Sequence, residues 1–199
     1  MFPGVCAISE PDRERWDARW SARLAENLGS REPHSLLVRF VLQKALTGGR
    51  ALDVACGLGQ NAIWLAQRGF TVDAVDISPV ALEYGRRAAA RAGVTVNFIQ
   101  DDLDVWTPQV EVYELVFGFR FLNRQLWPCL RAALRPGGWL LYQTFNLRKL
   151  SPDSDFPAEY LLDIGELPST FAGWKIVETG DDGGPSRDQS WIVCRKPGP

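Results

Sequence analysis

The sequence predicts an α/β fold with a doubly wound, mostly parallel seven-stranded sheet and an antiparallel C-terminal hairpin strand. From about residue 50 onward, apolar segments of five or six residues alternate with helical segments. The connections between them are short, and glycine or proline marks most of the boundaries. Near the C-terminus two apolar segments flank a turn-rich stretch, which is typical of a hairpin at an antiparallel edge.

The first 49 residues are predicted to form N-terminal helices that cap the functional site. The segment from Asp12 to Leu28 carries Trp16 and Trp20 four residues apart, so both indoles lie on one helical face. A second helix is predicted from Ser35 to Leu46, because its apolar residues recur at helical spacing before a glycine pair.

Residues 50–199 are predicted to form the core, and with the N-terminal helices they make one structural domain. Ser78 can cap a helix that Pro79 opens and Gly93 ends. The other predicted helices run from Asn61 to Arg68 and from Gln125 to Leu134. The predicted strands are Ala51–Ala55, Thr71–Asp76, Thr95–Gln100, Leu115–Phe119 and Trp139–Thr144, followed by a hairpin of Trp174–Glu178 and Ser190–Arg195 around Gly180–Arg187.

Composition narrows the class of protein. At 199 residues, with 46% hydrophobic and 23% charged residues, the chain fits one globular domain. A net charge of -2 argues against a nucleic-acid substrate, and no apolar run approaches the ~20 residues of a membrane span. Four widely spaced cysteines indicate neither a metal site nor disulfides, and the N-terminus lacks a secretory signal. We therefore expect a cytoplasmic protein, either a monomer or a homodimer.

A glycine turn follows the first predicted strand and is the most informative segment. Gly57 and Gly59 let the backbone turn sharply and approach a ligand, and Asp76 ends the next strand, as in sheets that bind an adenosine-bearing cofactor. The glycines alone also fit a dinucleotide fingerprint ending at Ala62. Asp53, inside the preceding apolar strand, would repel a pyrophosphate and favour a cationic ligand.

The run ALDVACGLGQNAIWLAQRGFTVDAVDISPVAL resembles motifs I and II of class I S-adenosylmethionine-dependent methyltransferases. Downstream, IQDDLD resembles the family segment at the adenine, and YELVFGFRFLNRQLWPCLRAALRPGGWLLYQTF resembles the fourth and fifth strands. The resemblance covers roughly residues 50–146 and is strongest to small bacterial methyltransferases related to the tellurite-resistance enzyme. It implies a Rossmann-like fold, S-adenosyl-L-methionine as cofactor and methyl transfer to a small-molecule acceptor.

The resemblance also implies the residues that hold the cofactor. It places the methionine end against Asp53 and the glycine turn, the ribose hydroxyls on Asp76, and the adenine amine on Asp102, with Asp101 as the alternative. A carboxylate suits the ribose because it can accept from both hydroxyls. The implied cofactor-binding residues are Asp53, Ala55, Gly57, Gly59, Asn61, Asp76, Ile77, Asp102, Leu103 and Phe119.

Residues that bind the methyl acceptor are harder to assign. An in-line methyl transfer requires the protein to position the nucleophile and to exclude water, and a general base is not obligatory. Polar side chains follow the fourth and fifth strands, and we take Arg120, Asn123 and Asn146 as catalytic candidates. Arg120 can hold an anionic acceptor or form a surface ion pair. Relatives often carry His at the position of Asn123, so no base is carried over there. His34, the only histidine, is more often a cap or surface residue than a catalyst.

Three questions stay open from the sequence. Trp16 and Trp20 either cover the cofactor pocket or pack in the core. The segment from Ser151 to Tyr160 is either a lid or an exposed loop. Two rival functions are an NAD(P)-dependent oxidoreductase and a non-catalytic S-adenosylmethionine-binding regulatory module.

Overall fold

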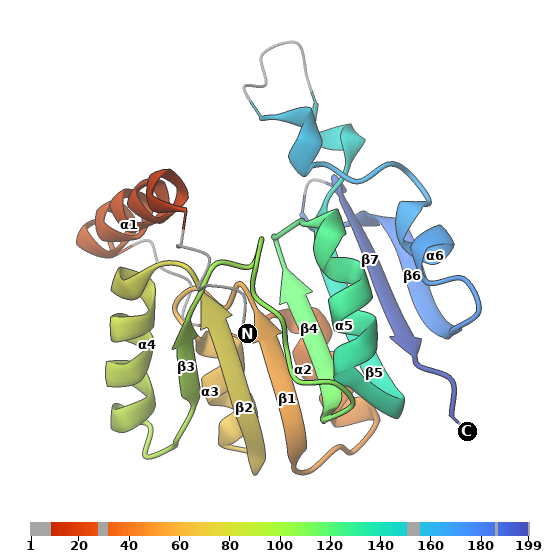
Figure 1. Ribbon diagram of the computed structural model, residues 1–199, viewed down its shortest axis with the longest axis horizontal. Helices are drawn as coiled ribbons and strands as arrows, with labels where there is room; N and C mark the ends of the chain where they lie inside the picture. The colour runs from red at the N-terminus through yellow and green to blue at the C-terminus, as the bar shows by residue number, and fades with distance from the viewer. Residues whose placement is uncertain (1–8, 28–31, 151–155, 186, 199) are drawn as a thin grey trace, which may run out of the picture. The chain divides into compact units, whose positions relative to one another are not determined.

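The structure, a computed structural model, describes residues 9–27, 32–150, 156–185 and 187–198 (Figure 1). Cys6, the end of the first predicted helix at Leu28 and the first half of the Ser151–Tyr160 segment lie outside these ranges. The chain divides into two compact units, Met1–Gly48 with Ala55–Thr107 and Gly49–Val54 with Pro108–Pro199. Each unit is described by itself.

The strands follow the order β3-β2-β1-β4-β5-β7-β6 in a seven-stranded sheet. The pairs β2–β3, β1–β4 and β4–β5 are parallel, whereas β7 runs antiparallel to both β5 and β6. These pairings confirm the predicted α/β class with its antiparallel C-terminal strand. The predicted hairpin of β6 and β7 lies at one end of this strand order, with β7 between β5 and β6.

The first unit contains four helices and two strands among its described residues. In chain order they are α1 (Glu10–Ala25), α2 (Ser35–Gln43), α3 (Gln60–Ala66), β2 (Phe70–Asp76), α4 (Pro79–Arg91) and β3 (Asn97–Gln100). As predicted, the Ser78 hydroxyl accepts the Ala81 amide proton at 3.2 Å and Pro79 opens α4. In contrast to the other helices of this unit, α1 has no buried residue. It packs against α4.

The second unit holds the other five strands. Its elements are β1 (Gly49–Val54), β4 (Tyr113–Phe119), α5 (Trp127–Ala133), β5 (Leu134–Phe145), α6 (Glu166–Thr170), β6 (Lys175–Gly183) and β7 (Gln189–Arg195), with short 3₁₀ turns η1 (Arg124–Leu126), η2 (Leu147–Lys149) and η3 (Ala158–Tyr160). Its core consists of apolar residues with no exposed surface, including Leu115, Phe117, Leu140 and Val193. No helix in the part of the chain that the structure covers is long and apolar enough to span a membrane.

Two predicted strand boundaries in this unit are wrong by five residues, and one helix end is wrong by one residue. The helix expected to reach Leu134 ends at Ala133, and β5 begins at Leu134 rather than at Trp139. Pro136 explains the difference, because it forces the chain before it to be extended. The strand expected to end at Glu178 continues as β6 to Gly183, and its register against β7 shifts between Ile176 and Glu178 and between Gly180 and Gly183. The short helix α6 was not predicted.

Candidate functional site

The loop that follows β1 is shaped by three residues in left-handed backbone conformations. Ala55 has φ 55°, Gly57 φ 53° and Gly59 φ 73°. Two glycines suit such angles, whereas at Ala55 the conformation strains the backbone. The Cys56 amide donates to the Val75 carbonyl at 3.0 Å, which attaches the loop to β2. The local fold therefore makes the sharp turn that the sequence predicted.

The two glycines also make room for aromatic rings of the same unit. A Cβ on Gly57 would lie 2.7 Å from Cζ2 of Trp20, and one on Gly59 would lie 2.5 Å from Cε1 of Phe98. Neither distance is possible between real atoms, so any side chain at these positions would displace a ring. The sequence attributed both glycines to the approach of a ligand, and the structure adds a packing reason that only the fold reveals.

Asp76 ends β2 and is 7% exposed. Its Oδ2 accepts the Gly57 amide proton at 2.7 Å, and its Oδ1 accepts the Ser78 amide proton at 3.0 Å. Burial raises the pKa of this carboxyl, and the nearby charge of Asp17 acts in the same direction, while the two amide donors oppose the rise. Each carboxylate oxygen still has a lone pair for a second donor, so the group fits a pair of ribose hydroxyls.

Asp102 and Asp101 follow β3 and differ in their surroundings. Asp102 is 6% exposed, and its Oδ2 accepts the Ser9 amide proton at 2.9 Å while its Oδ1 accepts that of Asp104 at 3.0 Å. Asp101 is half-buried and turns back to accept the Asp102 amide proton at 2.8 Å. Leu103 is buried beside them. The adenine assignment to Asp102 stays a prediction.

Asn61 and Ile77 have different positions around the loop. Asn61 is 5% exposed, and its Oδ1 accepts the His34 amide proton at 2.8 Å. The His34 ring in turn accepts the Leu36 amide proton at 3.3 Å and caps α2, in agreement with the expected capping role. The Asn61 side chain thus positions α2, whereas Ile77 is half-buried next to Asp76.

Two predicted cofactor residues lie in the second unit. Asp53, on β1, is 1% exposed and stands in register with Phe117 of β4. Phe119 ends β4, half-buried, with its ring centroid 5.8 Å from that of Phe117. The chain passes from Asp53 and Val54 directly into the glycine loop. A carboxylate inside an apolar strand fits a cationic ligand group at the end of that strand.

The three catalytic candidates have separate surroundings. Arg120 is exposed with φ 60°, and its guanidinium has no ion pair with any residue in the described ranges. Asn123 is half-buried and caps η1, since its Oδ1 accepts the Gln125 amide proton at 2.8 Å. Asn146 has no exposed surface.

The Asn146 side chain is fully engaged inside the second unit. Its Nδ2 donates to the Asp181 carbonyl at 2.9 Å and to Ser190 Oγ at 3.0 Å, while its Oδ1 accepts the Arg148 amide proton at 2.9 Å. Both amide protons are used, so this arrangement gives Asn146 a structural role and leaves no donor for an acceptor molecule. Arg120, in contrast to Asn146, presents an exposed donor group.

Sequence reasoning gave no role to Arg124, which the structure places at the centre of a cluster. Its Nε and Nη2 donate to the Glu166 carboxylate at 2.7 and 2.8 Å, and it also donates to the carbonyls of Glu159 and Leu161 at 3.0 and 2.8 Å. Arg124 and Glu166 are 42 residues apart, so no local sequence signal predicts the pair. Arg124 thereby fixes the described end of the predicted lid segment.

The remaining expectations concern metals, thiols and the N-terminal tryptophans. Within the described ranges no group of three or more His, Cys, Asp or Glu residues is arranged to bind a metal ion. Cys56 and Cys194 are buried free thiols, and Cys129 is a partly exposed one. Trp16 and Trp20 are both half-buried, which does not match packing in a core.

A separate hollow of about 440 Å³ lies in the first unit. The Gln60 Oε1 atom is buried near it without a hydrogen-bond partner among the residues that the structure describes. The hollow includes neither Asp76 nor Asp102, so we do not place the cofactor there. Its lining residues are Glu32, Pro33, Leu58, Gln60, Ile63, Trp64, Gln67, Tyr84, Ala88 and Arg91.

Comparison with known proteins identifies the family to which this loop and its carboxylates belong. Residues 51–138 match a family model described as a methyltransferase domain. Residues 51–138 are therefore similar to methyltransferase domains. The chain is 30% identical over 108 residues to the ubiquinone biosynthesis O-methyltransferase of Methylocella silvestris, an alignment that covers 52% of this chain and 42% of that protein. The alignment thus spans less than half the length of this relative.

Solved structures share the fold of the methyltransferase domain. TehB from Haemophilus influenzae superposes with a TM-score of 0.69 at 17% identity, covering 82% of this chain and 62% of that one. The [4+2]-cyclase SpnF superposes with a TM-score of 0.75 at 16% identity, covering 98% of each chain. At such identities the likeness shows the fold alone.

Proposed function

We propose that this chain transfers a methyl group from S-adenosylmethionine to a small-molecule acceptor. The observation that carries the proposal is the hydrogen bond between Asp76 and Gly57, which joins a proposed ribose-binding carboxylate to the glycine loop within one unit. The family match to residues 51–138 covers both residues. When bound, the cofactor supplies an electrophilic methyl group on a sulfonium.

The cofactor-binding roles proposed from the sequence fit the described side chains, except that Asn61 has a different role from the one proposed. Asp76 would accept from the ribose hydroxyls, and Asp102 with the Leu103 amide would contact the adenine. Asp53 and the glycine loop would hold the methionine end, beside Ala55, Ile77 and Phe119. Asn61 would act indirectly, because its side chain already holds the His34 amide.

The charge of Asp53 distinguishes this proposal from an NAD(P)-dependent oxidoreductase. A buried carboxylate at the end of the strand before the loop would repel a pyrophosphate and attract an ammonium or sulfonium group. The domain match is likewise to methyltransferases. A non-catalytic binding module would keep the same cofactor contacts, so only turnover separates it from the enzyme.

Methyl transfer by in-line displacement asks the protein to position the nucleophile and exclude water. Arg120 is the proposed contact for an anionic acceptor, because its guanidinium is exposed and makes no ion pair within the described ranges. The matched relative is named for O-methylation in ubiquinone biosynthesis, which supports an acceptor of small-molecule size. Net charge -2 supports an acceptor other than nucleic acid, and cysteines without disulfides support a reducing compartment such as the cytoplasm.

Calorimetry with S-adenosylmethionine, S-adenosylhomocysteine and NAD tests the cofactor. We expect binding of the first two, and NAD binding alone would overturn the proposal. Release of S-adenosylhomocysteine across thiols, oxyanions, amines and phenols then tests turnover. Asp53→Ala should remove both binding and release, with the melting temperature confirming that the variant folds. Full activity of that variant would contradict the assignment of Asp53.

A further inference from the structure

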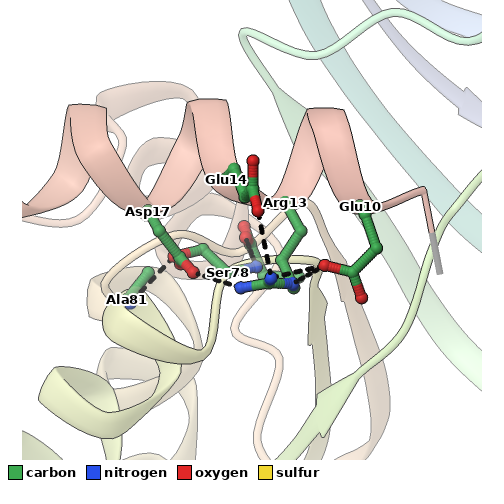
Figure 2. Close-up of polar contacts among 7 residues, drawn as sticks. Glu10, Arg13, Glu14, Asp17, Ser78 and Ala81 are labelled. Carbon is green, nitrogen blue, oxygen red and sulfur yellow. Dashed lines mark hydrogen bonds and ion pairs between the residues drawn. The ribbon is translucent and has the colours of Figure 1, made fainter.

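We propose that Asp17 of α1 is a positioning residue for the cofactor: its hydrogen bond to Ser78 docks α1 along the glycine loop and thereby controls how fast the cofactor exchanges. The inference rests on the proposed function. It goes beyond that function because it assigns the closing of the site to one side-chain contact. Figure 2 shows Ser78 between Asp17 of α1 and Ala81 of α4.

The contact between Asp17 and Ser78 is short and oriented on both sides. The Ser78 hydroxyl donates to Asp17 Oδ1 at 2.5 Å and accepts the Ala81 amide proton at 3.2 Å, so its single proton is directed at Asp17. Asp17 Oδ2 accepts from Arg13 at 3.1 Å, which fixes the orientation of the carboxylate. The Asp17 side chain is 18% exposed, so water screens this charge-assisted bond less than it screens a surface pair.

Helix α1 has little else to hold it in place. None of its residues is buried, and its first turn is cross-linked mainly to itself, through Arg13 and Glu10. A helix without a buried apolar face gains little from hydrophobic packing, so a few specific contacts decide its position. Contacts of this kind include those of Asp17, Trp20 and the residue before the helix, Ser9.

These three contacts fall on three different residues that we assign to the cofactor or place next to it. Ser9 donates its amide proton to Asp102, at the proposed adenine site. Asp17 binds Ser78, whose amide donates to Asp76 at the proposed ribose site. The Trp20 ring occupies the space beside Gly57, in the proposed methionine loop. Because α1 and Ser9 contact residues at all three proposed parts of the cofactor site, we expect cofactor release to require a displacement of α1 or of these contacts.

The test compares Asp17→Ala with Glu14→Ala in the full chain. Both changes remove one carboxylate near Arg13, and alanine favours the helix in each case, so α1 itself is not weakened. In the cofactor-free protein, the amides of α1 should exchange with deuterium about tenfold faster in Asp17→Ala, as expected for loss of one charge-assisted hydrogen bond. Glu14→Ala should exchange like the wild type.

The cofactor measurements use S-adenosylhomocysteine dissociation by stopped flow and steady-state rates. Asp17→Ala should release S-adenosylhomocysteine about tenfold faster and raise the KM for S-adenosylmethionine by a similar factor, because the docked state is lost. The transfer step itself should be unchanged when measured in a single turnover at saturating cofactor. Asp17→Asn keeps an oxygen that accepts the Ser78 proton, so it should restore most of the slow dissociation.

Each result separates this inference from the proposed function. If wild-type protein binds neither cofactor form, the proposed function fails, while deuterium exchange still tests whether Asp17 docks α1. If both forms bind but Asp17→Ala leaves exchange of α1 or dissociation unchanged, the positioning role is overturned. Equal effects of Glu14→Ala, or no rescue by Asp17→Asn, would also overturn it, because the cause would then be charge rather than this hydrogen bond.

Discussion

Asp76 and Gly57 are 19 residues apart in the chain and are joined by a hydrogen bond of 2.7 Å between Oδ2 and the amide. The end of β2 and the glycine loop therefore form one structural feature. A change in the carboxylate acts on the proposed ribose contact and on the loop at once.

Replacing Asp76 with Asn should weaken S-adenosylmethionine binding by about 30-fold, because one side of the amide presents a donor to a backbone N–H that needs an acceptor. Calorimetry measures the dissociation constant. Asp73→Asn is the matched control, since Asp73 lies on the same strand, is 3% exposed and accepts the Asn97 Nδ2 proton at 2.7 Å. That control should change the melting temperature but not the affinity. Equal loss of affinity in both variants would contradict the ribose role.

Cofactor affinity should fall as the pH is lowered through the raised pKa of the Asp76 carboxyl. Burial raises the pKa of Asp76, so the folded chain takes up this proton at a higher pH than the unfolded chain does. The group therefore disfavours folding above its folded-state pKa, and that cost disappears as the pH falls through it. The ribose contact requires the ionised form, so binding weakens over the same window. A pH series of dissociation constants should slope in the wild type and flatten in Asp76→Asn.

Gly57→Ala should destabilise the protein by about 3 kcal/mol, because the new Cβ meets both an unfavourable backbone angle and the Trp20 ring. Gly93→Ala is the control: Gly93 has φ 68°, and a Cβ there has nothing within 4 Å. We expect about 1 kcal/mol for that control in denaturant unfolding. Adding Trp20→Ala to Gly57→Ala should recover part of the difference. A loss no larger than that of Gly93→Ala would show that the ring does not pack there.

Arg124→Gln should raise the KM for the acceptor several-fold while leaving cofactor affinity unchanged. The guanidinium connects the Glu166 carboxylate to the carbonyls of Glu159 and Leu161, and glutamine cannot donate to all three. Limited proteolysis should cut this segment faster in the variant. Arg135→Gln, which removes an exposed ion pair with Glu114, serves as the control for loss of charge. Unchanged acceptor kinetics would exclude a role for this segment in acceptor binding.

The sequence was most informative where the residues that interact are close in the chain. The cap at Ser78, the helix start at Pro79 and the glycine turn are local patterns, and each is present in the structure. It was least accurate where a distant strand decides a boundary. The extension of β6 to Gly183 depends on pairing with β7, and Gly180 by itself indicates a turn.

The candidate site divides in the same way. The residue types at Asp53, Gly57 and Asp76 predict a cationic, adenosine-bearing cofactor from the sequence alone, because charge and backbone freedom are properties of single residues. The hydrogen bonds of the asparagine side chains were not predictable from the sequence. Asn146 donates its amide protons to Asp181 and Ser190, and the Asn61 side-chain oxygen accepts the His34 amide proton. These partners are distant in the chain and become neighbours only when the chain folds.

The sequence by itself determined the α/β class, the resemblance of the domain to a family and the residue types around its glycine loop. Periodicity, turn residues and a charge inside an apolar segment can be recognised from residues that are close together in the chain. The tertiary structure alone decided that α1 contacts Ser78 through Asp17 and Gly57 through Trp20, and that Arg124 holds the segment around Leu161. These contacts join segments that are far apart in the chain, and no sequence pattern indicates that the segments meet. Their energies depend on distance and burial, which only the folded chain defines.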